Sequence, residues 1–198
     1  ETNIIANNDG DLAYAFDVCK YANYTEPVVT VEETVTINGK IEAVAKIGNV
    51  YYATLAKAVA SAQNGETVTL LANAFGAGMV INKDITIDFN GNTYTFTDGV
   101  GSTGTPSNGF QILKGNEVTL KNGTLNVAAE SADKFYILIQ NYADLTVEDM
   151  TLDGTNLDKW SKTDGDSYVL SNNSGTVNIT GETNIIANND GDLAYAFD

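Results

Sequence analysis

The chain has 198 residues, of which ten are Lys and 26 are acidic, and its formal net charge at pH 7 is -16. It contains neither Arg nor His, which excludes His-based catalytic triads, His-ligated zinc sites and lyase chemistry that depends on a guanidinium group. Such an acidic surface repels nucleic acid and anionic lipid, and no apolar run reaches the roughly 18 residues of a membrane span. We therefore expect neither nucleic-acid binding nor membrane insertion.

Short apolar runs that alternate with polar residues recur along the chain and predict strands with one buried face. The central run of each group begins at Ile85, Val118, Leu145 or Val177, with spacings of 33, 27 and 32 residues. A further apolar run precedes most of these and another follows, so the repeating unit has three strands and three turns. An imperfect repeat of this length predicts an all-β solenoid, with a β-sandwich as the alternative.

One segment has helical periodicity instead. Residues Thr54–Gln63 place Leu55, Ala58 and Val59 on one face, with Thr54 as the N-cap and a stop signal at Asn64 and Gly65. Because a stack of coils ends in an apolar face with unpaired backbone groups, we expect this short helix to cover one end of the stack.

Two stretches around this helix, Tyr52–Leu71 and Val80–Gly91, resemble the opening of the right-handed parallel β-helices of the pectin-lyase-like superfamily. They are most similar to the repeats of bacterial surface and adhesin-type proteins. The matching features are the alanine-rich helix, the Gly-Glu-Thr-Val step into the first strand and the Ile-Asn-Lys-Asp-Ile-Thr-Ile motif. The resemblance implies a right-handed parallel β-helix of about five to six three-stranded coils with one short capping α-helix, but no single activity.

The two ends of the sequence are duplicates. Residues 1–17 (ETNIIANNDGDLAYAFD) recur unchanged as residues 182–198, so 181 residues carry independent information. A 181-residue unit has 22 acids against ten Lys, a net charge of -12. We expect a protein of tandem, nearly identical units with this period, in which residues 1–46 form the terminal coil of one unit. Residues 47–198 then hold the cap helix and the main coils.

The coil that would follow residue 198 has two candidate suppliers. Residues 18–46 of the same chain could fold back, as in a circular permutant, or residues 1–46 of a neighbouring molecule could dock. Head-to-tail contacts of the second kind do not close and build filaments. The residues expected to carry this self-association are Glu1, Ile4, Ile5, Leu12, Tyr14, Phe16, Ile185, Ile186, Leu193, Tyr195 and Phe197.

The outward positions of the central strands form a column if the coils are in register. We interpret this column as a solvated strand face with interleaved charges. Two of its carboxylates, Asp88 and Glu148, lie roughly 9–10 Å apart by strand spacing, near the upper limit for a glycosidase pair. Because Lys121 lies between them, we expect charge neutralisation rather than acid–base catalysis. The column comprises Thr86, Thr119, Thr146, Asn178 and Thr30, flanked by Asp88, Lys121, Glu148, Thr180 and Glu32.

Loops and turns supply the remaining ligand candidates. Trp160, with Lys159 and Lys162 beside it, is expected either to form a platform for a sugar ring on a glycan or a host surface or to cover an apolar coil edge. Acidic turns offer oxygen ligands to calcium but lack the spacing of a calcium-binding loop, so we expect no cofactor and keep calcium as an alternative. The acids of these turns are Asp9, Asp11, Asp164 and Asp166.

Together these features predict a non-catalytic structural or adhesive repeat module of a large, acidic, extracellular bacterial surface protein. The module is expected to associate with itself head to tail through its duplicated segment. The alternative is a carbohydrate-binding or carbohydrate-active β-helix of the glycosidase or lyase type.

Overall fold

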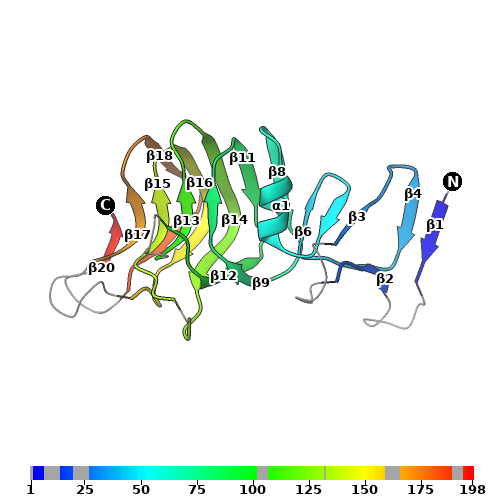
Figure 1. The fold of residues 1–198 in the computed structure, drawn as a ribbon, viewed down its shortest axis with the longest axis horizontal. Coiled ribbons are helices and arrows are strands. Elements are labelled where there is room, and N and C mark those ends of the chain that lie inside the picture. The colour runs from blue at the N-terminus through cyan, green and yellow to red at the C-terminus, as the bar shows by residue number, and fades with distance from the viewer. Residues whose placement is uncertain are drawn as a thin grey trace.

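A computed structural model describes residues 2–6, 14–19, 27–101, 107–131, 133–158, 166–188 and 194–198. Strands make up 58% of the chain and helix 4%, and the strands wind into a solenoid of about 5 turns. The expected all-β solenoid is confirmed. The molecule is elongated, and its two termini lie at opposite ends of the long axis (Figure 1).

The central strands of the coils pair in parallel and in the predicted register. Ile85 is the partner of Val118, Val118 of Leu145, and Leu145 of Val177. The repeat spacing therefore identified true neighbours. These strands are β8 (Glu66–Leu70), β11 (Ile85–Asp88), β14 (Glu117–Val127), β16 (Asp144–Asp153) and β18 (Thr176–Thr180).

Two further sets of parallel strands complete each coil. One is a five-stranded sheet of β10 (Met79–Ile81), β13 (Asn108–Ile112), β15 (Ile137–Asn141), β17 (Ser167–Asn172) and β20 (Ala194–Phe197). The other contains β9 (Ala74–Ala77), β12 (Thr93–Asp98), the second halves of β14 and β16, and β19 (Asn184–Ile186). The corner between the central strands and this last set holds Asn90, Asn122 and Asp149 at φ of 52°, 59° and 52°, the left-handed region that Asn and Asp tolerate best.

Apolar columns fill the interior of the stack. Phe96 packs edge to face against Phe110, with ring centroids 4.9 Å apart, and against Tyr94 at 5.3 Å. One buried amide also joins two adjacent coils, because the Nδ2 of Asn141 donates to the Oδ1 of Asn172 at 2.8 Å. The interior is therefore mainly apolar, with a buried amide that finds its partners in its own coil and the next.

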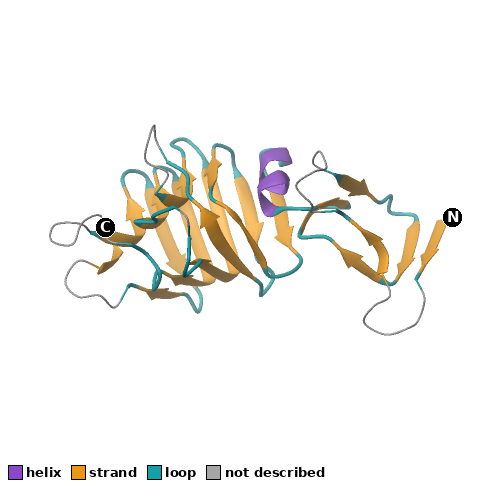
Figure 2. Cartoon of the chain, turned by 60° about the horizontal axis from the view of Figure 1, so that its bottom comes forward, coloured by secondary structure: helices purple, strands orange, loops and turns teal. Residues whose placement is uncertain are grey.

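Helix α1 (Leu55–Ser61) lies at one end of the coil stack (Figure 2). Thr54 caps it as predicted, accepting from the amide of Lys57 at 3.1 Å, and Leu55, Ala58 and Val59 are buried. The helix ends two residues earlier than Gln63, because Ala62 turns to an extended ψ of 143°. The Nζ of Lys83 donates to three carbonyl oxygens at this end, at 2.8–3.2 Å, and satisfies groups that no helical amide reaches.

The segment before the helix forms an N-terminal arm, which we define as β1 to β5. Its two parallel pairs are β1 (Thr2–Ile5) with β4 (Val35–Asn38) and β2 (Tyr14–Asp17) with β5 (Lys40–Glu42). An antiparallel hairpin, β6 (Ala45–Ile47) and β7 (Val50–Tyr52), links the arm to β8, and β3 (Val28–Thr30) pairs antiparallel with β7. Thr30 and Glu32 therefore lie at the opposite end of the molecule from β18, and they do not extend the column of Thr86 within this chain.

Candidate self-association interface

The two copies of the duplicated segment form the same strands in different surroundings. In the C-terminal copy, β19 pairs with β16 and β20 pairs with β17. In the N-terminal copy, β1 pairs with β4 and β2 pairs with β5. All four pairings are parallel, and within the described residues neither copy has a strand on its other edge.

The pairings place the same side chains against preceding strands in one copy and following strands in the other. Ile185 lies beside Leu152, while its duplicate Ile4 lies beside Ile37. The same holds for the aromatic position, since Phe197 lies beside Leu170 and its duplicate Phe16 lies beside Ile41. Each copy thus has paired the edge that the other copy leaves open.

The C-terminal coil, which we define as β18, β19 and β20, exposes its inward-facing side chains. Along one column Phe110 and Ile139 are fully buried, Leu170 is 2% exposed and Phe197 is 64% exposed. In the central column the step is the same, because Val147 is fully buried and Ile179 is 44% exposed. The end of the stack opposite α1 is therefore an open apolar face.

Other predicted self-association residues of the C-terminal copy lie around this face. Ile185 and Ile186 are half-buried, and Ile185 packs against the main core. The ring of Tyr195 stacks on Tyr168 with centroids 5.6 Å apart and remains 43% exposed. These side chains lie next to the open face and remain partly accessible to solvent.

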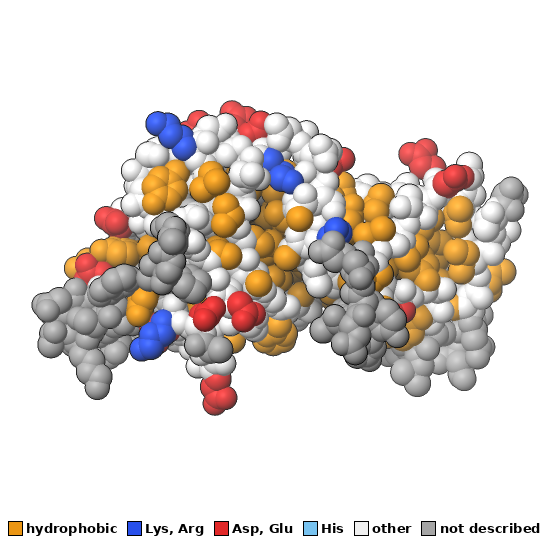
Figure 3. Space-filling model, viewed as in Figure 1, with side chains coloured by type: hydrophobic (Ala, Val, Ile, Leu, Met, Phe, Trp, Pro, Cys, Tyr) orange, Lys and Arg blue, Asp and Glu red, His pale blue; other side chains and the backbone are white. Residues whose placement is uncertain are grey.

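In the N-terminal copy the apolar side chains are also accessible. Ile5 is 75% exposed and Tyr14 is 44% exposed, while Phe16 is half-buried and packs edge to face on Tyr51 at 5.5 Å. Hydrophobic side chains reach the surface over the arm in the space-filling view (Figure 3). Phe16 also packs against a small apolar cluster of Val18, Ala43 and Ala53, which joins the arm to the residues that follow it.

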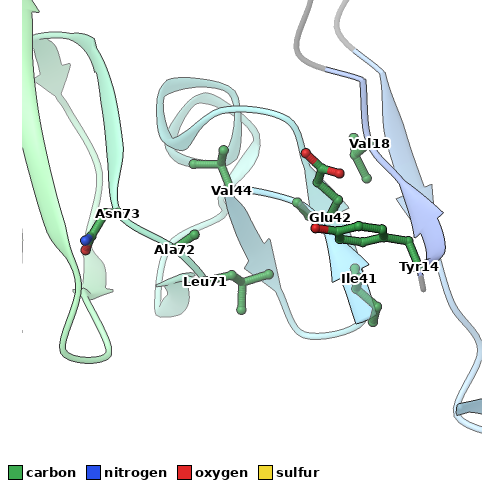
Figure 4. A pocket seen from close by; sticks show the side chains of 9 residues that line it. Tyr14, Val18, Ile41, Glu42, Val44, Leu71, Ala72 and Asn73 are labelled. Carbon is green, nitrogen blue, oxygen red and sulfur yellow. The ribbon is translucent and has the colours of Figure 1, made fainter. Parts of the chain in front are cut away.

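A hollow of about 290 Å³ lies where the arm meets the coil stack. Tyr14 extends from β2 toward Ile41 and Glu42 on one side of it, and Leu71 and Asn73 lie on the other (Figure 4). Glu42 is the charged residue among those that line it. The hollow thus lies beside the apolar cluster of Val18, Ala43 and Ala53, against which Leu71 also packs.

The solvated column is in the predicted register over four coils, with Thr86, Thr119, Thr146 and Asn178 side by side. Beside it, the Nζ of Lys121 lies 3.7 Å from Asp88 Oδ2. The other oxygen, Asp88 Oδ1, accepts from the backbone amide of Asn90 at 2.9 Å and from the side-chain amide of Asn122 at 3.1 Å. This carboxylate is therefore held by structural partners.

Several predicted residues lie outside the described part of the chain: Glu1, Asp9, Asp11, Leu12, Lys159, Trp160, Lys162, Asp164 and Leu193. The calcium candidate Asp166 is described, and its carboxylate accepts from the hydroxyl of Tyr168 at 2.8 Å. This hydrogen bond is the main reason that the pKa of Tyr168 is raised to about 12. Among the described residues, no group of three or more His, Cys, Asp and Glu side chains is arranged to hold a metal ion.

Comparison with known proteins gives no relative: no family model, no curated protein and no solved structure matches the chain. Within the described ranges, none of the helical structure is long and apolar enough to cross a membrane. The pairing of β2 with β5 is a part of the interface that the sequence analysis missed. Its signal in the sequence was the alternation of Ile41 with the polar residues Lys40 and Glu42.

Proposed function

We propose that the chain is a non-catalytic structural and adhesive repeat module of a large extracellular bacterial surface protein. The observation that carries this proposal is the complementary pairing of the duplicated segment, which has a preceding coil in one copy and a following pair of strands in the other. Successive modules would share this segment and continue head to tail. The fold is consistent with the resemblance to right-handed pectin-lyase-like β-helices of surface proteins.

Composition supports the same proposal. A net charge of -12 for each 181-residue unit makes a long array of such modules self-repelling and soluble. The sequence contains no His, the side chain that most often acts as a general acid or base, and no Arg to stabilise a developing negative charge. Reducing-sugar release from acidic and neutral polysaccharides tests the non-catalytic assignment, and a glycan array tests adhesion.

Continuation across the junction is tested by comparing the 198-residue chain with a two-module chain, residues 1–181 joined to residues 1–198. Phe197→Cys is introduced into both chains in a background that lacks Cys19 (Cys19→Ser in every module). In the longer chain the substituted residue is the one at the junction of the two modules, and residues 18–46 of the second module follow it. We expect the thiol to react several-fold more slowly in the two-module chain, because the open face is then covered.

Lys114→Cys, at an exposed turn, is the matched control and should react equally in both chains. Equal rates for Phe197→Cys in the two chains would refute the repeat-module proposal.

A further inference from the structure

We infer that the strands of the duplicated segment can be exchanged between chains, and that this exchange links separate chains. In this exchange β19 and β20 of one chain take the place of β1 and β2 against β4 and β5 of a second chain. The inference rests on the proposed function, because consecutive modules of one array would be joined by the same pairings. It goes further in assigning a second copy of the chain as the partner of the open C-terminal coil.

The register of the exchange follows from the register within one chain. Thr2 to Ile5 pair with Val35 to Asn38, so Asn184 of one chain would lie beside Thr36 of the second, and Ile185 beside Ile37. Phe16 pairs with Ile41, so Phe197 would meet Ile41 of the second chain. The apolar column that ends at the exposed Phe197 would then continue for one more coil.

The exchange replaces each pairing by an identical one. The strands that enter have the same sequence as the strands that leave, so every backbone hydrogen bond and side-chain contact to β4 and β5 is made again. What the linked form adds is cover for the open face, where Ile179, Tyr195 and Phe197 are 43–64% exposed. Exchange of identical elements between chains is a low-cost route to association. Here the contact is head to tail, so it is not closed by two-fold symmetry and further chains can be added.

Charge opposes the linking of two chains. The Asp17–Glu42 pair of the N-terminal arm would be replaced by an identical Asp198–Glu42 pair, so this contact does not change. Each chain carries a net charge of -16, however, so two chains repel one another, and salt screens this repulsion. Linking should therefore increase with ionic strength.

The test uses the full chain with Cys19→Ser, Thr36→Cys and Asn184→Cys. Thr36 and Asn184 are exposed. Thr36 belongs to β4, which lies at the end of the molecule opposite β18 and β20, the strands that precede and follow Asn184 in the chain (Figure 1). We expect oxidation to convert the monomer into a ladder of disulfide-linked multimers on a non-reducing gel, more completely at high salt. A synthetic peptide with the sequence of residues 182–198 should restore the monomer band, because it occupies β4 and β5.

Two variants calibrate this experiment. Thr36→Cys with Thr180→Cys places the second thiol at an exposed position out of register and should give no ladder. Asn3→Cys with Thr36→Cys should close a bond within one chain and run as a monomer.

The inference is overturned if the Thr36–Asn184 pair stays monomeric, if the Thr180 control forms an equal ladder, or if the peptide and a scrambled version act alike. Failure of the Asn3–Thr36 bond would overturn the register itself. A covered Phe197 in the two-module chain together with no intermolecular ladder would leave the repeat module standing and refute the exchange.

Discussion

Replacement of Asn141 by Leu is expected to lower the free energy of unfolding by about 2–4 kcal/mol. The side chain is fully buried. Its Oδ1 accepts from the amide of Ala143 at 3.1 Å, and its Nδ2 donates to the carbonyl of Ala143 and to Asn172 Oδ1, both at 2.8 Å. Leu has a similar volume, so the substitution removes these bonds while it leaves the backbone and the packing largely in place.

The magnitude follows from the burial of each partner. The amide of Ala143, in a residue 2% exposed, would lose its acceptor in a place that water does not reach, at a cost of about 1–3 kcal/mol. Each of the two donated bonds contributes about 0.5–1.5 kcal/mol net. Burial of the added apolar surface offsets part of this loss, which brings the total back to the stated range.

Urea unfolding followed by far-UV circular dichroism measures the effect, and the same loss should lower the Tm by about 5–15 °C. Asn82→Leu, at an exposed position two coils away along the stack, is the matched control and should change stability by less than about 0.5 kcal/mol. A loss below about 1 kcal/mol for Asn141→Leu would refute the reasoning that buried amide pairs hold the coils together.

Three further predictions concern the duplicated strand, a turn and alkaline stability. Ile185→Ala should cost about 1–2 kcal/mol and Ile4→Ala less, because only Ile185 packs against the main core; equal losses in urea unfolding would contradict this. Gly175→Ala should cost at least about 1 kcal/mol more than Gly91→Ala. Both glycines have positive φ, 88° and 78°, but a Cβ at Gly175 would overlap the backbone carbonyl of Ala143 in the preceding coil, whereas a Cβ at Gly91 would meet open space. Burial raises the pKa of Tyr94 above its ordinary value of 10.0. The contribution of this shift to stability should be fully present below about pH 10 and should be lost above it, because the unfolded chain loses the proton first. Tyr94→Phe should flatten that fall between urea curves at pH 8 and pH 11, and an unchanged slope would show that another group is responsible.

The sequence was sufficient for the coil stack because one physical rule repeats there. Strands with one buried face alternate strictly, so the starting points at Ile85, Val118 and Leu145 identified strand partners directly. The cap helix was equally readable from its apolar face and from the N-cap at Thr54. Both signals are local and need no knowledge of distant neighbours.

The N-terminal arm was less readable because local and distant pairings compete there. Thr30 was predicted to belong to the column of the central strands, yet β3, which contains it, pairs antiparallel with β7. The hairpin of β6 and β7 turns through Gly48 and Asn49, with Gly48 at a φ of 53°. A short connection of this kind is quickly closed and presents an edge to β3, whereas β18 lies at the far end of the molecule.

The duplicated segment shows why identical sequence does not fix a single environment. Residues such as Phe16 and Phe197 form the same strand in both copies, but their exposure differs because only the neighbouring strands decide it. The two ends of the stack differ, since α1 lies at one end and the C-terminal coil is open at the other. A further module that docks on the open C-terminal coil covers it. The array then has a new open coil at its end only if the incoming module carries its own coils. The duplicated 17 residues alone would fill the place on β4 and β5 and stop growth there.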